Sequence, residues 1–396
     1  MIWFSGFLIL FITKFNISEA QFLLNSDSAF KAGAPNSGRL WGYTFGDYYY
    51  KAHADTASRG GSNQYTGIPK NRNEFAFRRI YLGYDYNISQ KFAVELLLAA
   101  EDNVVQGNNP PTGDLLSDGK LTFYIKLANI RWKNVWKGTD LVVGQLSTPA
   151  FPLLSEKIWG YRSIERTVAD IRRTPSFDLG ASLQGQFDSK GNYGYNIMIG
   201  NGTGAKPEGD NFKWFYADVF AKFLDKRLIF DLYADYERLT WENGFHHARN
   251  MVKGFVAYTT PSFTAGLEAF VNKGKDDVVG VNGTVKDTLS ANALGISAYV
   301  HGNIVKDRLG YFARFDSYNP DTQYENGRYT KYTGFTSNYE PNNKEQFITA
   351  GLDFTPVKNV HFMPNVWYNK YMSNTAVSNT SYDLVYRMTF YFVFGK

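Results

Sequence analysis

The feature that most constrains this chain is a series of segments, each about ten residues long, in which polar and apolar residues alternate. Successive side chains of a β-strand point to opposite faces, so each segment has an apolar face and a polar face. In Tyr382–Phe394, Tyr386 and Phe390 share one face, while Asp383 and Arg387 share the other. Soluble strands average about five or six residues, whereas a tilted strand that crosses a bilayer needs about nine to eleven.

Sixteen such segments follow one another from residue 40 onward. Their predicted bounds are Leu40–Tyr50, Glu74–Tyr86, Lys91–Asp102, Lys120–Trp132, Thr139–Leu146, Phe177–Phe187, Tyr193–Gly200, Trp214–Leu224, Arg227–Arg238, Met251–Thr260, Phe263–Lys273, Asn292–Gly302, Asp307–Tyr318, Glu345–Thr355, Val360–Lys370 and Tyr382–Phe394. Short connections such as Asp225–Lys226 alternate with long ones such as Lys51–Asn73 and Gly274–Ala291. Outer-membrane barrels have short periplasmic turns and long outer loops. The sequence therefore predicts an all-β fold, a transmembrane antiparallel β-barrel of about 16 strands.

The composition agrees with a barrel and excludes other classes of protein. Aromatic residues make up 17% of the chain, yet the mean hydropathy is −0.35. Apolar residues are therefore interleaved with polar ones rather than gathered into the ~20-residue runs of membrane-spanning helices. The chain has no cysteine, which excludes disulfides and thiolate metal sites. Its net charge of +5 includes no long basic block, so we expect no nucleic-acid partner.

The first residues have the features of a secretory signal peptide. Ile2–Ile12 is a compact apolar run, and Ser18 and Ala20 supply the small residues of a cleavage site. The segment before the apolar run lacks the basic residue that is usual in a signal peptide. A short membrane anchor is the alternative interpretation, but the apolar run is too short to span a bilayer. The predicted parts are a signal peptide at 1–20, an N-terminal lead-in at 21–39 and the barrel at 40–396. This organisation predicts export to the outer membrane of a Gram-negative bacterium, where the barrel contacts lipid.

One long connection, Ser147–Ser176, differs from the others, which are rich in Gly, Asn and Asp. Its sequence predicts a helix over Ser155–Arg172 with Ser155 as the N-cap and prolines on both sides. Arg162 and Arg166 are four residues apart and would share one face of this helix. We expect this helical loop between the fifth and sixth strands to fold into the lumen and form a constriction, which sets selectivity by size and charge. A surface helix with solvated charges is the alternative.

The basic residues of this loop are the predicted constriction and solute-binding residues. They are Lys157, Arg162, Arg166, Arg172 and Arg173. Three acidic residues in the same loop leave a local charge of +2 (five minus three), which favours anions weakly. The predicted basic residues of the lumen wall are Arg79, Lys126, Lys222, Arg314 and Arg387. The predicted acidic residues of that wall are Glu95, Asp218, Asp231, Asp235, Glu268, Asp316, Asp353 and Asp383.

Four segments resemble the phosphate-selective porin O and P family. They are FRRIYLGYDY at Phe77–Tyr86, VGQLSTPAFPLLSE at Val143–Glu156, WGYRSIERTVADIRR at Trp159–Arg173 and DLGASLQG at Asp178–Gly185. The resemblance extends over about residues 74–240 and is looser toward the C-terminus. It implies a sixteen-stranded barrel, often trimeric, with an inward-folded third outer loop and with phosphate as a solute. The family's ladder of Arg and Lys residues is not matched position by position, and the mixed wall does not describe a dedicated anion pore.

No catalytic or metal-binding motif is found in the sequence. The only adjacent histidines, His246 and His247, would project apart on a strand. His361 and Asn365 are interpreted as polar residues that line the lumen, and neither a G-x-S-x-G elbow nor a P-loop is present. We therefore predict no enzyme, no cofactor and no metal.

The predicted function is passive diffusion of small hydrophilic solutes through a porin that prefers anions weakly. We expect small anionic or neutral solutes and, in a homotrimer, further copies of this chain as partners. Three alternatives remain open at this point. They are a structural or assembly-partner barrel with a plugged lumen, a barrel enzyme such as a lipase or protease, and a sugar-selective porin in which Trp159 and Tyr161 form the contact surface.

Overall fold

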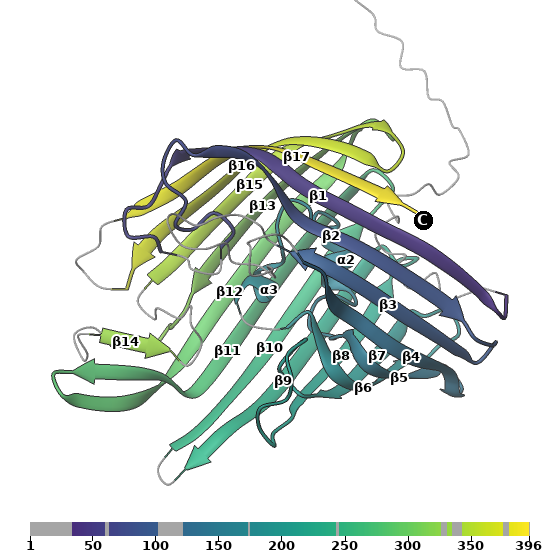
Figure 1. The fold of residues 1–396 in the computed structure, drawn as a ribbon, viewed down its shortest axis with the longest axis horizontal. Coiled ribbons are helices and arrows are strands. Elements are labelled where there is room, and N and C mark those ends of the chain that lie inside the picture. Colours follow the sequence, from purple (N-terminus) through teal and green to yellow (C-terminus); the bar gives the residue numbers. More distant parts are fainter. Residues whose placement is uncertain are drawn as a thin grey trace, which may run out of the picture.

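A computed structural model of the chain describes residues 34–59, 63–101, 122–172, 175–242, 245–325, 331–334, 343–374 and 380–395. The predicted signal peptide, most of the predicted lead-in and Arg173 lie outside the described residues. Within the described residues, the strands tilt around a common axis and form a barrel (Figure 1).

Sixteen long strands form the wall in the described part of the chain. They are β1 (Ser37–His53), β2 (Asn73–Asn87), β3 (Phe92–Glu101), β4 (Tyr124–Trp136), β5 (Thr139–Ser147), β6 (Phe177–Gln186), β7 (Tyr193–Gly200), β8 (Trp214–Phe223), β9 (Leu228–Glu242), β10 (Phe245–Thr259), β11 (Phe263–Asn282), β12 (Val285–Val305), β13 (Leu309–Asn319), β15 (Asn343–Val357), β16 (Val360–Ser373) and β17 (Ser381–Phe394). A four-residue strand, β14 (Lys331–Gly334), pairs with β11 beyond the wall.

The sheet is closed because its first and last strands pair with each other. β1 pairs antiparallel with β2 along one edge and with β17 along the other, in a register that sets Gly42 opposite Phe394. Closure leaves the ring without an open edge, so every wall strand pairs with a neighbouring strand on both sides. The predicted antiparallel barrel of about 16 strands is confirmed, and each of the sixteen predicted segments overlaps one wall strand.

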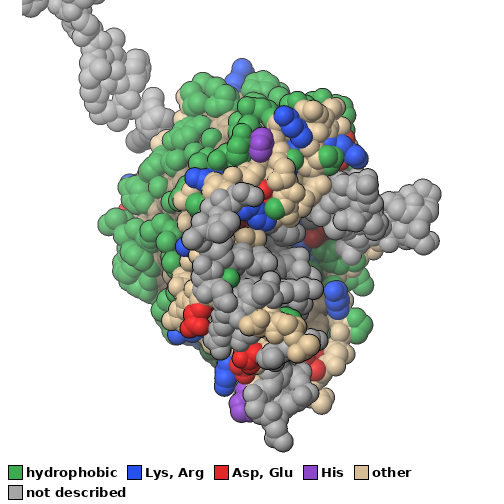
Figure 2. Space-filling model, turned by 90° about the vertical axis from the view of Figure 1, so that its left-hand side faces the viewer, with side chains coloured by type: hydrophobic (Ala, Val, Ile, Leu, Met, Phe, Trp, Pro, Cys, Tyr) green, Lys and Arg blue, Asp and Glu red, His purple; other side chains and the backbone are tan. Residues whose placement is uncertain are grey.

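Alternate residues of the wall face opposite sides of the cylinder. In β17, Asp383, Arg387 and Thr389 are buried, whereas Tyr386 and Met388 are exposed. Figure 2 faces the end with the long connections; hydrophobic side chains cover the flanks, and charged side chains lie across the end. An apolar surface of this extent marks contact with lipid or with another protein. Among the described residues, no helix has the length and apolar character needed to cross a bilayer.

The structure corrects one predicted long connection. Gly274–Ala291 is not a loop, because β11 and β12 continue through most of it and pair as far as Asn282 and Val285. The turn between them includes Gly283, whose φ is +61°. An Asn-Gly dipeptide between β-branched residues is a strong hairpin signal, so the sequence did contain the information. In Figure 1 this hairpin extends past the wall, where β14 pairs with it.

Two glycines allow aromatic rings to cover the seam between β1 and β17. Gly42 and Gly46 face outward, and the rings of Phe394 and Phe390 lie over them. A Cβ added at Gly42 would meet the Phe394 ring and come within 2.6 Å of the Tyr81 backbone oxygen. The rings of Phe394 and Phe390 therefore pack directly against the β1 backbone at these two glycines.

Candidate functional site

The connection between β5 and β6 lies inside the barrel. Arg78 of β2 donates a hydrogen bond from Nη1 to the backbone oxygen of Ser163 at 2.8 Å. From β10, the Lys253 ammonium donates to Ser155 Oγ at 3.2 Å. β2 and β10 are eight strands apart in a ring of sixteen, so they stand on opposite sides of the wall. The connection therefore contacts opposite sides of the wall across the lumen.

The helix predicted over Ser155–Arg172 is not continuous. The connection contains two helices of one turn each, α2 (Ser155–Trp159) and α3 (Val168–Arg172). Gly160 directly follows α2 and has the left-handed φ of +70° that is typical of the residue terminating a helix. Arg162 and Arg166 lie between the two helices and do not share a helix face.

The predicted N-cap is also wrong. Leu154 occupies the N-cap position of α2 and makes no side-chain capping bond. Ser155 is the first helical residue, and its Oγ accepts a hydrogen bond from Lys253 of the wall. The Ser155 hydroxyl thus binds a wall residue 98 positions away in the chain.

The structure pairs the central arginines of the loop with loop carboxylates. Arg162 forms ion pairs with Glu156 and, at 2.9 Å, with Asp170. The Arg166 guanidinium lies 4.0 Å from the other oxygen of Asp170. Burial raises the pKa of the Glu156 carboxyl, and Arg162 opposes this shift. The charge of Arg162 is thus balanced locally before any solute arrives.

The remaining predicted loop residues are in different environments. Arg172 binds Glu345 of β15 at 2.5 Å and donates to Asn63 at 3.2 Å. Lys157 faces a cavity described below. Arg173 lies outside the described residues. The structure therefore brings Lys157 and Arg162 to one cavity but does not bring the loop's basic residues together as one cluster.

The predicted basic residues of the wall are mostly buried inside the cylinder and have partners. Lys126 bonds to Glu101, and Arg79 lies 3.6 Å from the same carboxylate. Arg387 donates to Asn365 Oδ1 at 2.6 Å. Arg314 of β13 binds the loop, because its Nη1 donates to the Arg166 backbone oxygen at 2.6 Å. The Arg314 Nη2 pairs with Asp316 at 2.5 Å. Lys222 is half-buried, with its ammonium 5.0 Å from the ring of Phe220. The predicted acidic residues are also buried, apart from Glu95, which is half-buried.

A second connection, between β1 and β2, also enters the lumen, which the sequence analysis missed. Tyr65 is 0% exposed, and its hydroxyl donates to Asp47 at 2.7 Å. Lys51 donates to the Tyr65 backbone oxygen at 2.7 Å. Asn63 donates to Glu345, the carboxylate that also binds Arg172. The two connections are thus joined through one glutamate of the wall.

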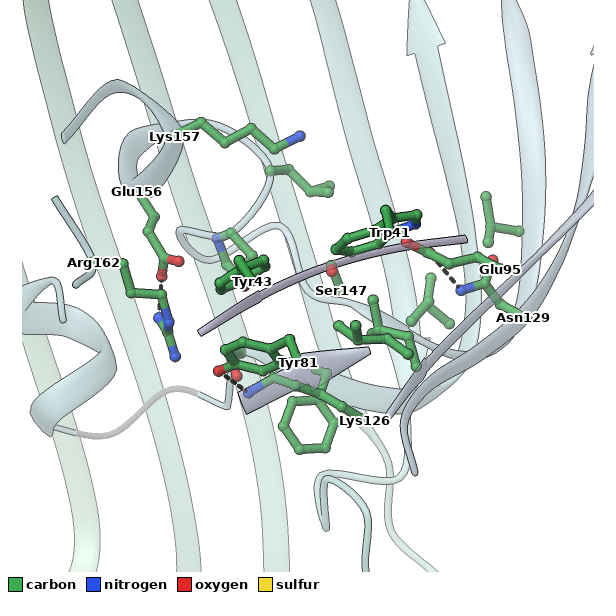
Figure 3. A pocket seen from close by; sticks show the side chains of 18 of the residues that line it. Trp41, Tyr43, Tyr81, Glu95, Lys126, Asn129, Ser147, Glu156, Lys157 and Arg162 are labelled. Carbon is green, nitrogen blue, oxygen red and sulfur yellow. Dashed lines mark hydrogen bonds and ion pairs between the residues drawn. The ribbon is translucent and has the colours of Figure 1, made fainter. Parts of the chain in front are cut away.

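A cavity of about 180 Å³ lies between the β5–β6 connection and the wall from β1 to β6. Its ionisable lining residues are Glu95, Lys126, Arg131, Glu156, Lys157 and Arg162. Its aromatic lining residues are Trp41, Tyr43, Phe45, Tyr81, Phe177 and Tyr391. Figure 3 shows the cavity, with the Arg162–Glu156 pair on one side, Tyr43 next to it and Trp41 beyond.

The aromatic residues of β1 are not among the predicted site residues. Aromatic side chains occur on both faces of this strand, so apolar character alone does not distinguish the faces. A signal was nevertheless present, because Trp41, Tyr43 and Phe45 alternate in phase with Asp47 and Lys51. Charged residues in that phase assign it to the lumen.

The one His–Asp pair near the cavity's loop does not form a catalytic triad. His361 Nδ1 lies 2.8 Å from Asp353 and 3.2 Å from the Thr355 hydroxyl. A triad places acid and nucleophile on different ring nitrogens, whereas here both face the same one. Across the described residues, no group of three or more His, Asp or Glu side chains is arranged to hold a metal ion.

Comparisons with known proteins identify the fold. No protein-family model and no curated protein matches the chain, so the resemblance to the phosphate-selective family stays a prediction. Among solved structures, the outer membrane channel DcaP of Acinetobacter baumannii is similar, with a TM-score of 0.64, 12% identity and coverage of 92% of this chain and 99% of that one. Outer-membrane expressed OmpT of Vibrio cholerae has a TM-score of 0.56, 9% identity and coverage of 92% and 99%. The trimer form of OmpT, folded in vitro, has a TM-score of 0.55, 9% identity and coverage of 91% and 100%. At such identities the likeness concerns the fold alone: this chain has the closed antiparallel β-barrel of outer membrane proteins.

Proposed function

We propose that this chain is an outer-membrane porin through which small hydrophilic solutes pass by passive diffusion. The observation that carries the proposal is a barrel with an apolar exterior and an interior rich in charged side chains, which is the polarity of a water-filled lumen in lipid. The loop that spans the lumen leaves a cavity of about 180 Å³ beside it. The structural likeness to the outer membrane channel DcaP supports the proposed porin function.

The loop between β5 and β6 is the proposed constriction. Its residues Lys157 and Arg162 line the cavity together with Lys126 and Arg131 of β4. Four basic lining residues against two acidic ones support a weak preference for anions. Since Arg162 is already paired with two carboxylates, phosphate is expected to be held weakly at most. Weak holding is compatible with transport, because conduction requires that a solute leave as readily as it enters.

The proposal includes export and assembly. Residues 1–20 would direct the chain through the inner membrane and be removed, which leaves the barrel to insert in the outer membrane. The solved trimer form of OmpT supports a homotrimer for this chain.

A barrel with a plugged lumen is the second candidate, and one observation favours it. Connections from both β1–β2 and β5–β6 occupy the lumen and share Glu345 as a partner. A plugged barrel would anchor or assemble other proteins instead of conducting. Conductance distinguishes the two candidates.

Planar-bilayer recording of the purified protein tests the proposal. We expect steady current in KCl and, under a salt gradient, a reversal potential that favours anions slightly. Replacing Arg162 and Arg166 with alanine leaves Glu156 and Asp170 unbalanced, so the reversal potential should shift toward cations. Alanine at Arg227 and Arg308, which are exposed at short turns, is the matched control.

Two results would count against these statements. A protein that inserts but passes no current is a plugged barrel and not a porin. If the Arg162/Arg166 variant changes neither conductance nor selectivity, the loop is not the constriction.

A further inference from the structure

A row of three aromatic rings faces the cavity from β1. Because alternate residues of a strand share a face, Trp41, Tyr43 and Phe45 stand side by side along the lumen. Their rings are nearly parallel: Trp41 and Tyr43 are 6.2 Å apart at 12°, and Tyr43 and Phe45 are 6.4 Å apart at 7°. Trp41 and Phe45 are 4% and 2% exposed, whereas Tyr43 is only half-buried. Tyr43 is thus the most accessible ring of the row.

Neighbouring rings hold Tyr43 in place. The Tyr81 ring lies 4.5 Å away at 41°, and the Tyr391 ring meets Tyr43 edge-on at 6.2 Å. A ring supported on several sides loses little conformational entropy when a solute stacks on it. Tyr43 is therefore a rigid, flat contact surface within an otherwise charged cavity.

The loop offers hydrogen-bond donors and acceptors next to this surface. Arg162 and Glu156 lie beside Tyr43, close enough for their charges to act on it (Figure 3). Lys157 lines the same cavity. Guanidinium and ammonium groups only donate hydrogen bonds, and carboxylates only accept them. A group that both donates and accepts, such as a hydroxyl, can bond to either partner of the Arg162–Glu156 pair.

The carboxylates paired with Arg162 make that arginine a poor site for an anion. An anion at Arg162 would lie near Glu156 and Asp170, which already neutralise that arginine. A neutral solute avoids this repulsion, and its hydroxyl groups keep the hydrogen bonds that charged partners strengthen.

We propose that this cavity is a subsite for a neutral, ring-shaped polyhydroxylated solute, of the chemical class of a pyranose sugar. The apolar C–H face of the ring stacks on Tyr43, since the negative face of an aromatic ring attracts positively polarised C–H groups. The hydroxyl groups at the ring edge bond to Arg162, Glu156 and Lys157. This inference rests on the proposed porin function and names a solute class for it.

Blocking of the ionic current by sugars tests the inference. D-glucose and its linear counterpart sorbitol are added separately to an open channel recorded in KCl. Stacking requires a ring, so glucose should reduce the current at a lower concentration than sorbitol, by roughly three- to tenfold. Tyr43→Leu should remove this difference, and Tyr43→Phe should keep it. Tyr48→Leu, which changes an exposed tyrosine on the outer face of the same strand, should leave the difference intact.

The outcomes separate this inference from the porin proposal. A wild-type channel that conducts but responds equally to glucose and sorbitol overturns the sugar subsite and leaves the porin intact. So does an undiminished glucose preference in Tyr43→Leu. Stronger block by sodium phosphate than by glucose would show that the cavity prefers an anion. Absence of any current would remove the porin proposal itself.

Discussion

At the scale of single residues, Lys253 illustrates how charge is balanced inside the barrel. It is 0% exposed, and its ammonium lies 3.2 Å from Asp231 and 3.7 Å from Glu268. The same ammonium donates to Ser155 of the loop. One buried cation therefore faces carboxylates from both neighbouring strands and binds the start of α2.

Replacing Lys253 with methionine should destabilise the barrel markedly. Removing one partner of a buried ion pair costs about 3–5 kcal/mol, because the remaining charges stay buried without compensation. The measurement is the urea midpoint of the folded barrel in detergent, followed by its resistance to heat on electrophoresis. Lys273→Met, at an exposed position of β11, is the control and should unfold at the wild-type midpoint. Equal midpoints for both variants would contradict this role.

The pKa of Glu156 gives a second expectation at this scale. Burial raises that pKa, so on acidification Glu156 gains its proton at a higher pH than an ordinary glutamate does. Arg162 is then balanced by Asp170 alone. Anion permeability should therefore rise as the pH falls, which reversal potentials between pH 7 and about 4 would measure.

Two variants check that assignment. Glu156→Gln should show at neutral pH the selectivity that the wild type reaches only in acid, and it should lack the first step of the titration. Glu208→Gln removes a half-buried carboxyl outside the cavity lining whose pKa is lowered, chiefly by its hydrogen bond with Lys213, so its profile should match the wild type. A wild-type profile for Glu156→Gln would assign the titration to other groups.

Residue identity alone did not reveal which charged side chains of the loop are already paired with one another. The sequence marked Arg162 and Arg166 as site residues because of their charge and their spacing of four. It could not show that Glu156 and Asp170 face Arg162, since that contact depends on the break at Gly160. Trp41 and Tyr43 were passed over because both faces of β1 carry aromatic residues.

At the scale of elements, wall strands can be predicted from their local sequence, whereas the connection inside the barrel cannot. A wall strand is predictable from its own ten or so residues, because one face meets lipid and the other meets water. The β5–β6 connection is not, because its conformation depends on wall residues such as Arg78, Lys253, Arg314 and Trp367 that are remote in sequence. The sequence predicted one continuous helix in this loop, whereas the structure has two short helices.

Arg314 gives a prediction for the loop as an element. Arg314→Leu removes the bond to the Arg166 backbone oxygen and leaves that part of the loop without its β13 anchor. A less restrained loop should fluctuate across the lumen, so single-channel records should show larger current noise and brief closures. The control is Arg308→Leu in the exposed turn before β13. Records as quiet as the wild type would mean that other contacts suffice to hold the loop.

At the scale of the whole molecule, stability depends on the seam where the cylinder closes. Gly42→Val places a branched side chain against the Phe394 ring and the Tyr81 backbone oxygen. Overpacking of this kind costs about 1–3 kcal/mol, and the yield of folded barrel after refolding should fall. Gly254→Ala is the control, because an added Cβ there meets nothing within 4 Å. Equal refolding yields for the two variants would show that the seam tolerates added bulk.

Because β1 pairs with β17, the wall strands form a closed ring in which the first and last strands are ordinary neighbours. Ser37 and Phe394 end close to the same rim, because Gly42 and Phe394 are direct neighbours in the sheet. A short linker would therefore be enough to join the two ends of the wall, Ser37 and Phe394, and new ends could be cut at a tight turn such as Asp225–Lys226. Such a circular permutant would keep the order of neighbours around the cylinder unchanged. The fold thus depends on which strands are neighbours around the ring. The chain ends could lie at any tight turn of that ring, in evolution or in engineering.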